Sequence, residues 1–395
     1  MCLFVAETTQ QNNMQPIVNP NAPASWENPY GYWPSGLHWE LLKAICQKDN
    51  QEALQVWREE RDIDAAPLGM SRLFPLLYRR LSADDPSDPD LARYKSVYRY
   101  TLYRNNLYFH RLRHAVESLE QAGIPVMFIK GSALALGYYQ DMGLRYMADF
   151  DITVPFEAYH EAKQIVLASG FKQPFDLNAS YWHMSRSRPF VDDEGFEFDL
   201  HWRVMNGYVK KDIPGVWENT QHFDYRGYRM CIPCDEVNFI HCFKHGLSPN
   251  PNEPIRWVVD AIEILDKSTR PLDWDFIQTF YKDKQFEADF KNALRFIKVL
   301  RPDIDIPLKL DNRVPLMELQ SRLKTRPQTG GLLTHLNTRW QHLQSEGELE
   351  NPVKKLWYSR YCLHNYYNVE NDLRLTKAVS RAMLRRLKRK LVKPA

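Results

Sequence analysis

The stretch that decides the fold is Val126-Met127-Phe128-Ile129-Lys130-Gly131-Ser132. Its first four residues are a short apolar run between Pro125 and Gly131, which is the pattern of a buried strand. The Ala- and Leu-rich segment 132–139 predicts a helix that begins where this strand ends. Glycine at such a junction lets a phosphate approach the backbone, and the free N–H groups of a new helix favour anions. Because strand–glycine–helix junctions are common, a plain turn is the alternative at this point.

Two acidic residues follow the junction on a second predicted strand, residues 149–154. Asp149 and Asp151 alternate with apolar residues, so both point to one face of that strand, about 6–7 Å apart at their backbones. Two like charges placed together repel unless a cation lies between them. Mg²⁺ is the divalent ion that suits carboxylate and triphosphate oxygens. A solvated strand face without metal is the alternative.

A third strand is predicted over residues 196–204, where apolar and ionisable residues alternate without a break. The apolar row belongs to the core, and the opposite row carries Glu197, Asp199, His201 and Arg203. Asp199, or Glu197 in its place, would add a third carboxylate beside Asp149 and Asp151 and complete a two-metal site. A wet strand face again explains the polar row without chemistry. The three features in this order are much less expected by chance than any one of them.

These residues resemble a known sequence signature. Gly131-Ser132, Asp149-Phe150-Asp151 and Asp199 resemble the hG[GS]…Dh[DE]h…h[DE]h pattern of the polymerase-beta-like nucleotidyltransferase superfamily. More narrowly, the chain resembles the bacterial family of uncharacterised nucleotidyltransferases, at Phe128-Ile129-Lys130-Gly131, Arg145, Asp149, Asp151 and Asp199-Leu200-His201-Trp202. The sixteen residues between Ser132 and Asp149 are more than the superfamily usually has, although the narrower family tolerates them. The resemblance is good over residues 120–205 and looser over 38–120 and 205–300.

The resemblance implies an α+β fold, in which a small mixed sheet of the polymerase-beta nucleotidyltransferase type is flanked by helical regions on both sides. Joined to the composition along the chain, it predicts five segments. They are a disordered lead-in (1–36), an N-terminal helical region (37–122), the nucleotidyltransferase core (123–206), a C-terminal helical region with a short hairpin (207–376) and a basic amphipathic tail (377–395).

The resemblance also implies an activity, the Mg²⁺-dependent transfer of an NMP group from an NTP to a hydroxyl of a small molecule, glycan or protein. Asp149, Asp151 and Asp199 would be the catalytic ligands of two Mg²⁺ ions, and Asp199 would help to deprotonate the acceptor hydroxyl. The nucleotide phosphates would contact Lys130, Gly131, Ser132 and Arg145. For Lys130 and Arg145, the alternative is an ion pair with Asp149 or Asp151.

Three further residues are candidates for contact with nucleotide or acceptor. His201 lies on the third strand, while His245 and Asp260 lie on predicted helices that resemble the His- and Asp-containing helices after the family's core. A structural hydrogen bond is the alternative for each of the three.

Two cysteines ahead of a histidine pair invite a zinc interpretation. Cys231 and Cys234 precede His241 and His245, but the six residues between the two pairs are fewer than zinc fingers usually have. Pro233 at the end of a predicted hairpin explains the local sequence without metal, so the sequence favours a structural role.

Composition places the chain among globular proteins. Its 395 residues predict two to three domains, and 44% hydrophobic with 13% aromatic residues suffice for a sizeable core. No 18-residue apolar window predicts a membrane span, and the first residues lack the basic and apolar regions of a signal peptide. Six cysteines are too few for a disulfide scaffold, which favours a reducing, cytoplasmic location.

Charge is distributed unevenly along the chain. Residues 377–395 contain eight Lys and Arg residues and no acidic residue, a charge of +8. Because the whole chain has a net charge of +3, residues 1–376 have a net charge of −5. A mildly acidic body is not expected to grip a nucleic-acid duplex. The tail has apolar residues at every fourth position and suits peripheral attachment to an anionic membrane surface or an acidic partner, and a solvated terminal helix without a partner is the alternative. The competing hypothesis is therefore a catalytically silent nucleotide-binding or scaffold protein docked by its tail.

Overall fold

A computed structural model describes residues 36–174, 186–205, 213–247, 255–280 and 284–308. The predicted lead-in, apart from Gly36, the basic tail and the C-terminal region beyond residue 308 lie outside the described residues. The helices are α1 Leu37–Cys46, α2 Gln51–Glu60, α3 Leu68–Ser71, α4 Phe74–Asp84, α5 Leu91–Gln121, α6 Lys130–Leu134, η2 Ala135–Tyr139, η3 Phe156–Ala158, α7 Tyr159–Ala168, α8 Asp235–Gly246, α9 Arg256–Lys267, α10 Trp274–Gln278 and α11 Lys284–Leu300.

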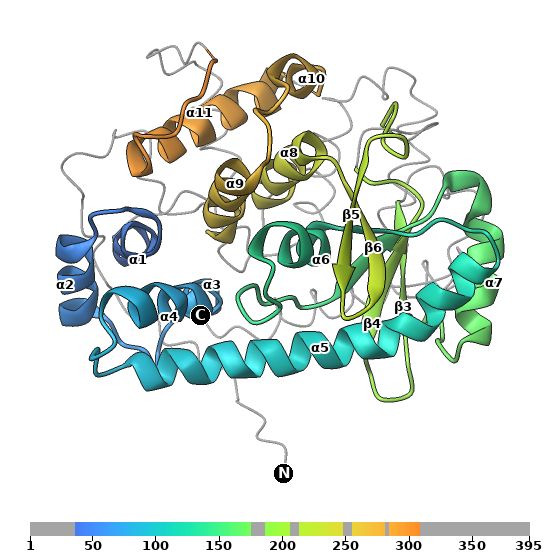
Figure 1. Cartoon of the computed structure of the whole chain (residues 1–395), viewed down its shortest axis with the longest axis horizontal. Helices are drawn as coiled ribbons and strands as arrows, with labels where there is room; N and C mark the ends of the chain where they lie inside the picture. Colours follow the sequence, from blue (N-terminus) through green and yellow to red (C-terminus); the bar gives the residue numbers. More distant parts are fainter. Residues whose placement is uncertain (1–35, 175–185, 206–212, 248–254, 281–283, 309–395) are drawn as a thin grey trace, which may run out of the picture.

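Helix α5 runs along one side of the molecule and joins the N-terminal helices α1–α4 to the sheet (Figure 1). It ends just before Gly123, which adopts a φ of 77°, and the backbone N–H of Ile124 donates to the carbonyl of Leu119 at 3.0 Å. The helix has buried residues along one stripe and charged residues elsewhere. Among the described helices, none is both long and apolar enough to cross a membrane.

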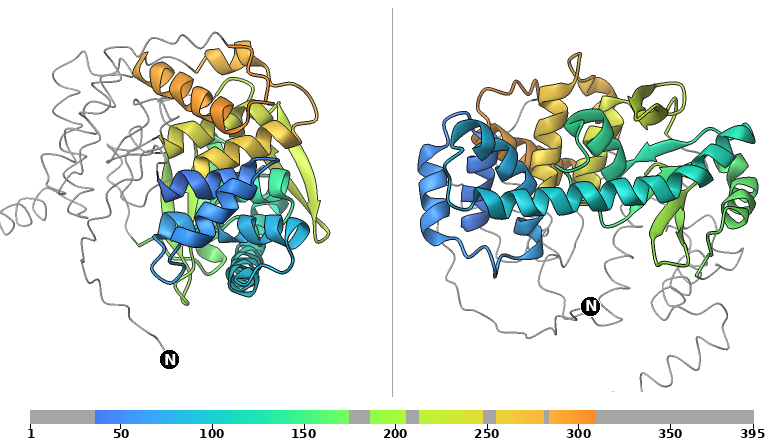
Figure 2. Two further views of the ribbon diagram at one scale, coloured as in Figure 1. Left: turned by 90° about the vertical axis from the view of Figure 1, so that its left-hand side faces the viewer. Right: turned by 60° about the horizontal axis from the view of Figure 1, so that its bottom comes forward.

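The central sheet is small and mixed, as predicted. Its strands are β1 Met127–Ile129, β2 Phe150–Thr153, β3 Ser187–Val191 and β4 Glu197–His201, in the order β1-β2-β4-β3. β2 and β4 are parallel, and the two outer strands are antiparallel to their neighbours. All three residues of β1 are buried, in agreement with its apolar run. The fold is therefore α+β, with helical regions on both sides of the sheet (Figures 1 and 2).

Two predicted elements differ from the structure where β1 ends. The predicted helix 132–139 begins earlier, at Lys130, and its second half is the π-helical η2. The predicted strand 149–154 begins only at Phe150, so Asp149 precedes β2 instead of lying on it. The reason is that β1 stops at Ile129, opposite Asp151, and offers no partner for residues further toward Asp149.

A second hairpin of β5 Thr220–Tyr225 and β6 Tyr228–Pro233 packs with β6 beside β1. It turns at Arg226-Gly227, and these two residues have positive φ angles of 54° and 76°. The chain then enters α8, which packs on α6 and on α9. This arrangement brings α8 and α9 next to the junction between β1 and α6 (Figure 1).

Candidate active site

Asp151 and Asp199 are direct neighbours across the parallel pair β2–β4, and His201 follows on the same strand. Residues two apart on a strand share a face, so the three side chains meet on one side of the sheet. One ligand atom from each lies within 4.8 Å of the other two, and this is the single such His, Cys, Asp or Glu cluster among the described residues. The Nε2 of His201 is 2.8 Å from Asp151 Oδ1 and 3.7 Å from Asp199 Oδ2.

Lys130 supplies the positive charge of this cluster. It adopts a φ of 53° at the end of β1, a left-handed conformation that is uncommon for a residue with a side chain. Its Nζ forms an ion pair with Asp151 and lies 3.4 Å from His201 Nε2. Of the two expectations for Lys130, the structure thus contains the ion pair with Asp151.

The electrostatic state of the cluster follows from burial and from Lys130. Burial alone would raise the pKa of Asp151, but the Lys130 ammonium and the hydrogen bond with His201 outweigh it and hold that pKa well below its ordinary value. Burial, and then the charges of Asp151 and Asp149, raise the pKa of Asp199 to about 6. Burial and the nearby Lys130 lower the pKa of His201 to about 3, so its imidazole is neutral at pH 7.

The two other predicted carboxylates differ in position. The residue Asp149 as a whole is exposed, but its carboxyl group is partly shielded from water. This desolvation, and then the charge of Asp151, raise its pKa. Its own charge acts on Asp199, so it lies within electrostatic reach of the cluster. Glu197 is exposed at the start of β4, opposite Val191 of β3. Asp199, rather than Glu197, is therefore the β4 carboxylate beside Asp151.

Gly131 and Ser132, predicted to contact phosphates, both have packing roles. Ser132 is buried, and its Oγ donates to the carbonyls of Ile129 at 2.9 Å and Asp151 at 3.2 Å, which links β1 to β2. A Cβ on Gly131 would lie 2.5 Å from Arg145 Nη1 and 3.0 Å from Met147 Cγ. A contact with phosphate stays a prediction for both residues.

We expect Gly131→Ala to lower both stability and turnover, because Arg145 cannot move away without breaking its own hydrogen bonds. The loss of stability should be about 1–3 kcal/mol, as for other overpacked sites, measured by chemical denaturation. The control is Ser96→Ala, a benign substitution at an exposed position on α5. Gly195→Ala would not serve as a control, because Gly195 has a positive φ and the substitution would add backbone strain. Unchanged stability of Gly131→Ala would contradict the close packing of Arg145.

Arg145 does not pair with Asp149 or Asp151, so that alternative is wrong. Its Nε and Nη2 donate to the two carboxylate oxygens of Asp260, each at 2.9 Å, and the hydroxyl of Tyr139 donates to Asp260 Oδ1 at 2.9 Å. Arg145 and Asp260 are both buried. The Arg145 guanidinium outweighs the effect of burial and lowers the pKa of Asp260, which is therefore an anion at neutral pH.

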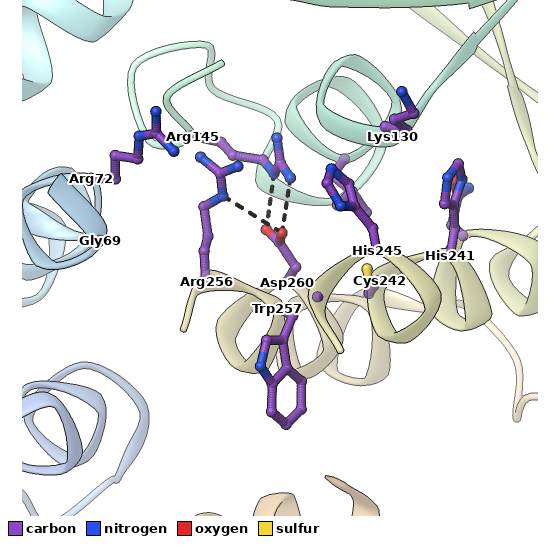
Figure 3. A pocket seen from close by; sticks show the side chains of 13 residues that line it. Gly69, Arg72, Lys130, Arg145, His241, Cys242, His245, Arg256, Trp257 and Asp260 are labelled. Carbon is purple, nitrogen blue, oxygen red and sulfur yellow. Dashed lines mark hydrogen bonds and ion pairs between the residues drawn. The ribbon is translucent and has the colours of Figure 1, made fainter. Parts of the chain in front are cut away.

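A pocket of about 660 Å³, part of which opens to solvent, connects these residues (Figure 3). The predicted residues Lys130, Arg145, His245 and Asp260 all line it. Arg72 and Arg256 line it too, and neither was among the site residues predicted from the sequence. Arg256 lies one turn before Asp260 on α9, and this spacing was a signal for it. Arg72 carries no such signal, because it comes from the distant N-terminal helical region.

Cys231 and Cys234 do not line the pocket, and they lie outside the group of Asp151, Asp199 and His201, which we call the carboxylate cluster. Both are free thiols, and burial raises the pKa of Cys231 and brings that of Cys234 to about 11. Neither belongs to a group of close metal-ligand atoms within the described ranges. The cysteine pair therefore fits the structural role that the sequence favours.

Comparison with solved structures gives distant similarities. A solution structure of the antibiotic-resistance factor ANT(2″)-Ia is 13% identical, with a TM-score of 0.33, covering 49% of this chain and 97% of that one. A nucleotidyltransferase-like protein from Paracoccidioides brasiliensis is 12% identical, with a TM-score of 0.33, and the match covers 55% of this chain and 92% of that one. A putative nucleotidyltransferase from Thermotoga maritima is 14% identical, with a TM-score of 0.28, and the match covers 36% of this chain and 86% of that one.

Comparison with sequences gives a family. No curated protein matches the chain significantly. The family model described as "Uncharacterised nucleotidyltransferase" matches residues 68–302, which include the carboxylate cluster and every residue of the pocket. Because this match spans more than half of the 395 residues, the chain belongs to the uncharacterised nucleotidyltransferase family and is an enzyme of that class.

Proposed function

We propose that this nucleotidyltransferase transfers an NMP group from an NTP to a hydroxyl group of a small molecule, a glycan or a protein, in an Mg²⁺-dependent reaction. The observation that supports this most is the pairing of Asp151 with Asp199 across two parallel strands, inside the segment that matches the family. Two carboxylates so close together repel each other; Lys130 forms an ion pair with Asp151, while the pKa of Asp199 is raised, which favours a further cation beside Asp199.

The donor set fits a divalent cation. Asp151 and Asp199 offer carboxylate oxygens, and the neutral imidazole of His201 offers a nitrogen within the same 4.8 Å. Asp149 is the proposed ligand of a second ion, since its charge reaches the same cluster. Mg²⁺ bound there would neutralise charge on the triphosphate and lower the pKa of the acceptor hydroxyl.

The residues of the chain have separate roles in this proposal. Asp199, with a pKa raised to about 6, is a base that can accept the proton of the acceptor hydroxyl. The hydroxyl oxygen forms its bond to the α-phosphorus as the bond to the bridging oxygen breaks, and pyrophosphate leaves. Lys130 keeps Asp151 ionised, and Lys130, Gly131, Ser132 and Arg145 lie along the proposed path of the phosphates.

We place this reaction in the cytoplasm. The chain has only six cysteines, and the four that the structure describes are free thiols, which is typical of a reducing compartment.

The direct test uses α-³²P-labelled NTPs with Mg²⁺ and a cell extract as the source of acceptor. Wild type should release pyrophosphate and label a product, and Asp149→Asn/Asp151→Asn should do neither. Equal signals from wild type and the double variant, or no turnover of any NTP, would favour the competing hypothesis of a catalytically silent nucleotide-binding protein.

A further inference from the structure

Three guanidinium groups converge in the pocket from three parts of the chain (Figure 3). Arg72 follows α3, Arg145 lies between η2 and β2, and Arg256 is the first residue of α9. We call these three residues the arginine cluster. Each guanidinium is held in place by the protein. Arg145 donates to Asp260, Arg256 donates to the backbone carbonyl of Tyr146 at 2.6 Å, and the guanidinium of Arg72 lies 5.1 Å from the centre of the Tyr146 ring.

Positive charge exceeds negative charge within the cluster. Asp260 is the one carboxylate among the residues that line the pocket, and together with the three guanidinium groups it gives a net charge of +2; the ammonium of Lys130 also lines the pocket but forms an ion pair with Asp151. The side chain of Arg72 makes no hydrogen bond or ion pair with any described residue, and its Nε is buried. Burial, and then the charge of Arg145, lower the pKa of Arg256 to about 10, which reflects the crowding of cations. An anion bound between these groups would relieve that repulsion.

His241 is a second, independent sign of a ligand. It lines the same pocket, is only 6% exposed, and its Nδ1 has no hydrogen-bond partner among the described residues. A buried polar atom without a partner costs about 1–3 kcal/mol, and a ligand that accepts a hydrogen bond from this atom would recover that cost. Burial lowers the pKa of His241 well below its ordinary value, so the imidazole is neutral and can donate one hydrogen bond without adding charge.

The pocket adjoins the carboxylate cluster. Lys130 lines the pocket and also forms the ion pair with Asp151. The charge of Asp149 acts to raise the pKa of Arg72, and the charge of Arg256 acts to lower the pKa of Asp149, so these groups interact electrostatically. An anion held by the arginine cluster would therefore lie beside the proposed reaction centre.

We propose that the arginine cluster binds phosphate groups, and that Arg72 and Arg256 determine the affinity for them. The fork of a guanidinium matches two oxygens of a phosphate, and a tetrahedral, multiply charged group can meet donors from three directions, unlike a planar carboxylate. The phosphates belong either to the triphosphate of the donor NTP or to a phosphorylated acceptor. The phosphate site itself follows from the pocket, and only its link to catalysis rests on the proposed function.

The test measures binding of inorganic triphosphate to the full chain by calorimetry, in EDTA so that no metal contributes. Arg72→Gln and Arg256→Gln should each weaken binding about 10- to 100-fold, since hydrogen bonds between charged groups are lost. Arg99→Gln, an exposed arginine on α5 with the same change in charge, should bind as wild type does. Arg256→Lys should fall between wild type and Arg256→Gln because it keeps the charge and loses the fork.

Stability separates a binding role from a structural one. Arg72→Gln removes a cation that has no ion pair, so the melting temperature without ligand should stay constant or rise while triphosphate affinity falls. Binding of triphosphate that is equal in wild type and both glutamine variants, or no binding to wild type at millimolar concentration, would overturn the proposal.

Competition identifies the source of the phosphate. If an α,β-methylene NTP displaces triphosphate, the cluster holds the donor's phosphates, and if both bind together, it holds those of an acceptor; either result supports a phosphate site. The outcome is independent of the turnover assay. Arginine-dependent binding without NTP turnover would sink the proposed function alone, and carboxylate-dependent turnover with unaffected arginine variants would sink this inference alone.

Discussion

Replacing Asp199 by asparagine is expected to reduce NTP turnover by about 10³-fold or more while the protein stays folded, as for other residues that act directly in a reaction. The amide keeps the shape of the side chain but can neither accept the proton of the acceptor hydroxyl nor offer an anionic ligand. Asp199 lies opposite Asp151 on the neighbouring strand, so the variant removes half of the paired carboxylates. Pyrophosphate release under saturating NTP measures the effect.

The control is Glu197→Gln, which makes the same chemical change two residues earlier on β4. Glu197 is exposed and lies opposite Val191, so its variant should keep wild-type turnover. Stability gives a second readout. The pKa of Asp199 is raised from its ordinary value of 3.8 to about 6 in the folded protein. Its ionisation therefore lowers the stability of the fold as the pH rises from about 4 to about 6. Asp199→Asn should thus be at least as stable as wild type at pH 7 in metal-free buffer, and equal loss of turnover in both variants would contradict the assignment.

Asp260→Asn is expected to lower the free energy of unfolding by about 3–5 kcal/mol, because it leaves Arg145 as an unpaired buried charge. Asp260 and Arg145 are buried and share two hydrogen bonds of 2.9 Å, and Arg256 lies 4.0 Å away on the same side. The melting temperature should fall by roughly 10 °C for a domain of this size. Thermal and urea denaturation without ligand measure both quantities.

A second pair on α9 provides the matched control. Asp266 also accepts two hydrogen bonds from an arginine, Arg301, but Asp266 is 40% exposed and Arg301 has Asp303 as a further partner. Asp266→Asn should therefore cost no more than about 1 kcal/mol. The double variant Arg145→Met/Asp260→Asn should be more stable than Asp260→Asn, since it removes the unpaired charge. A double variant that is less stable would refute this account of the pair.

Local patterns in the sequence were enough to predict individual strands of the sheet. The apolar run before Lys130 and the strict alternation around Asp199 place strands where the structure has β1 and β4, and Gly123 ends α5 with a positive φ. These signals are local, because strand and helix periods and a glycine with positive φ depend on neighbours in the chain. The spacing of Asp149 and Asp151 was less informative, since the end of β1 decided where pairing stops.

The sequence by itself determined the α+β class and the carboxylates that the family signature contains. Only the tertiary structure decided the partners of the charged groups. Arg145 pairs with Asp260 across 115 residues, Lys130 with Asp151, and Arg72 reaches the pocket from the N-terminal helices. The physical reason is that a side chain's charge acts on whatever the fold brings within a few ångströms, and burial then strengthens or reverses its effect. Neither distance nor burial is written in the order of residues.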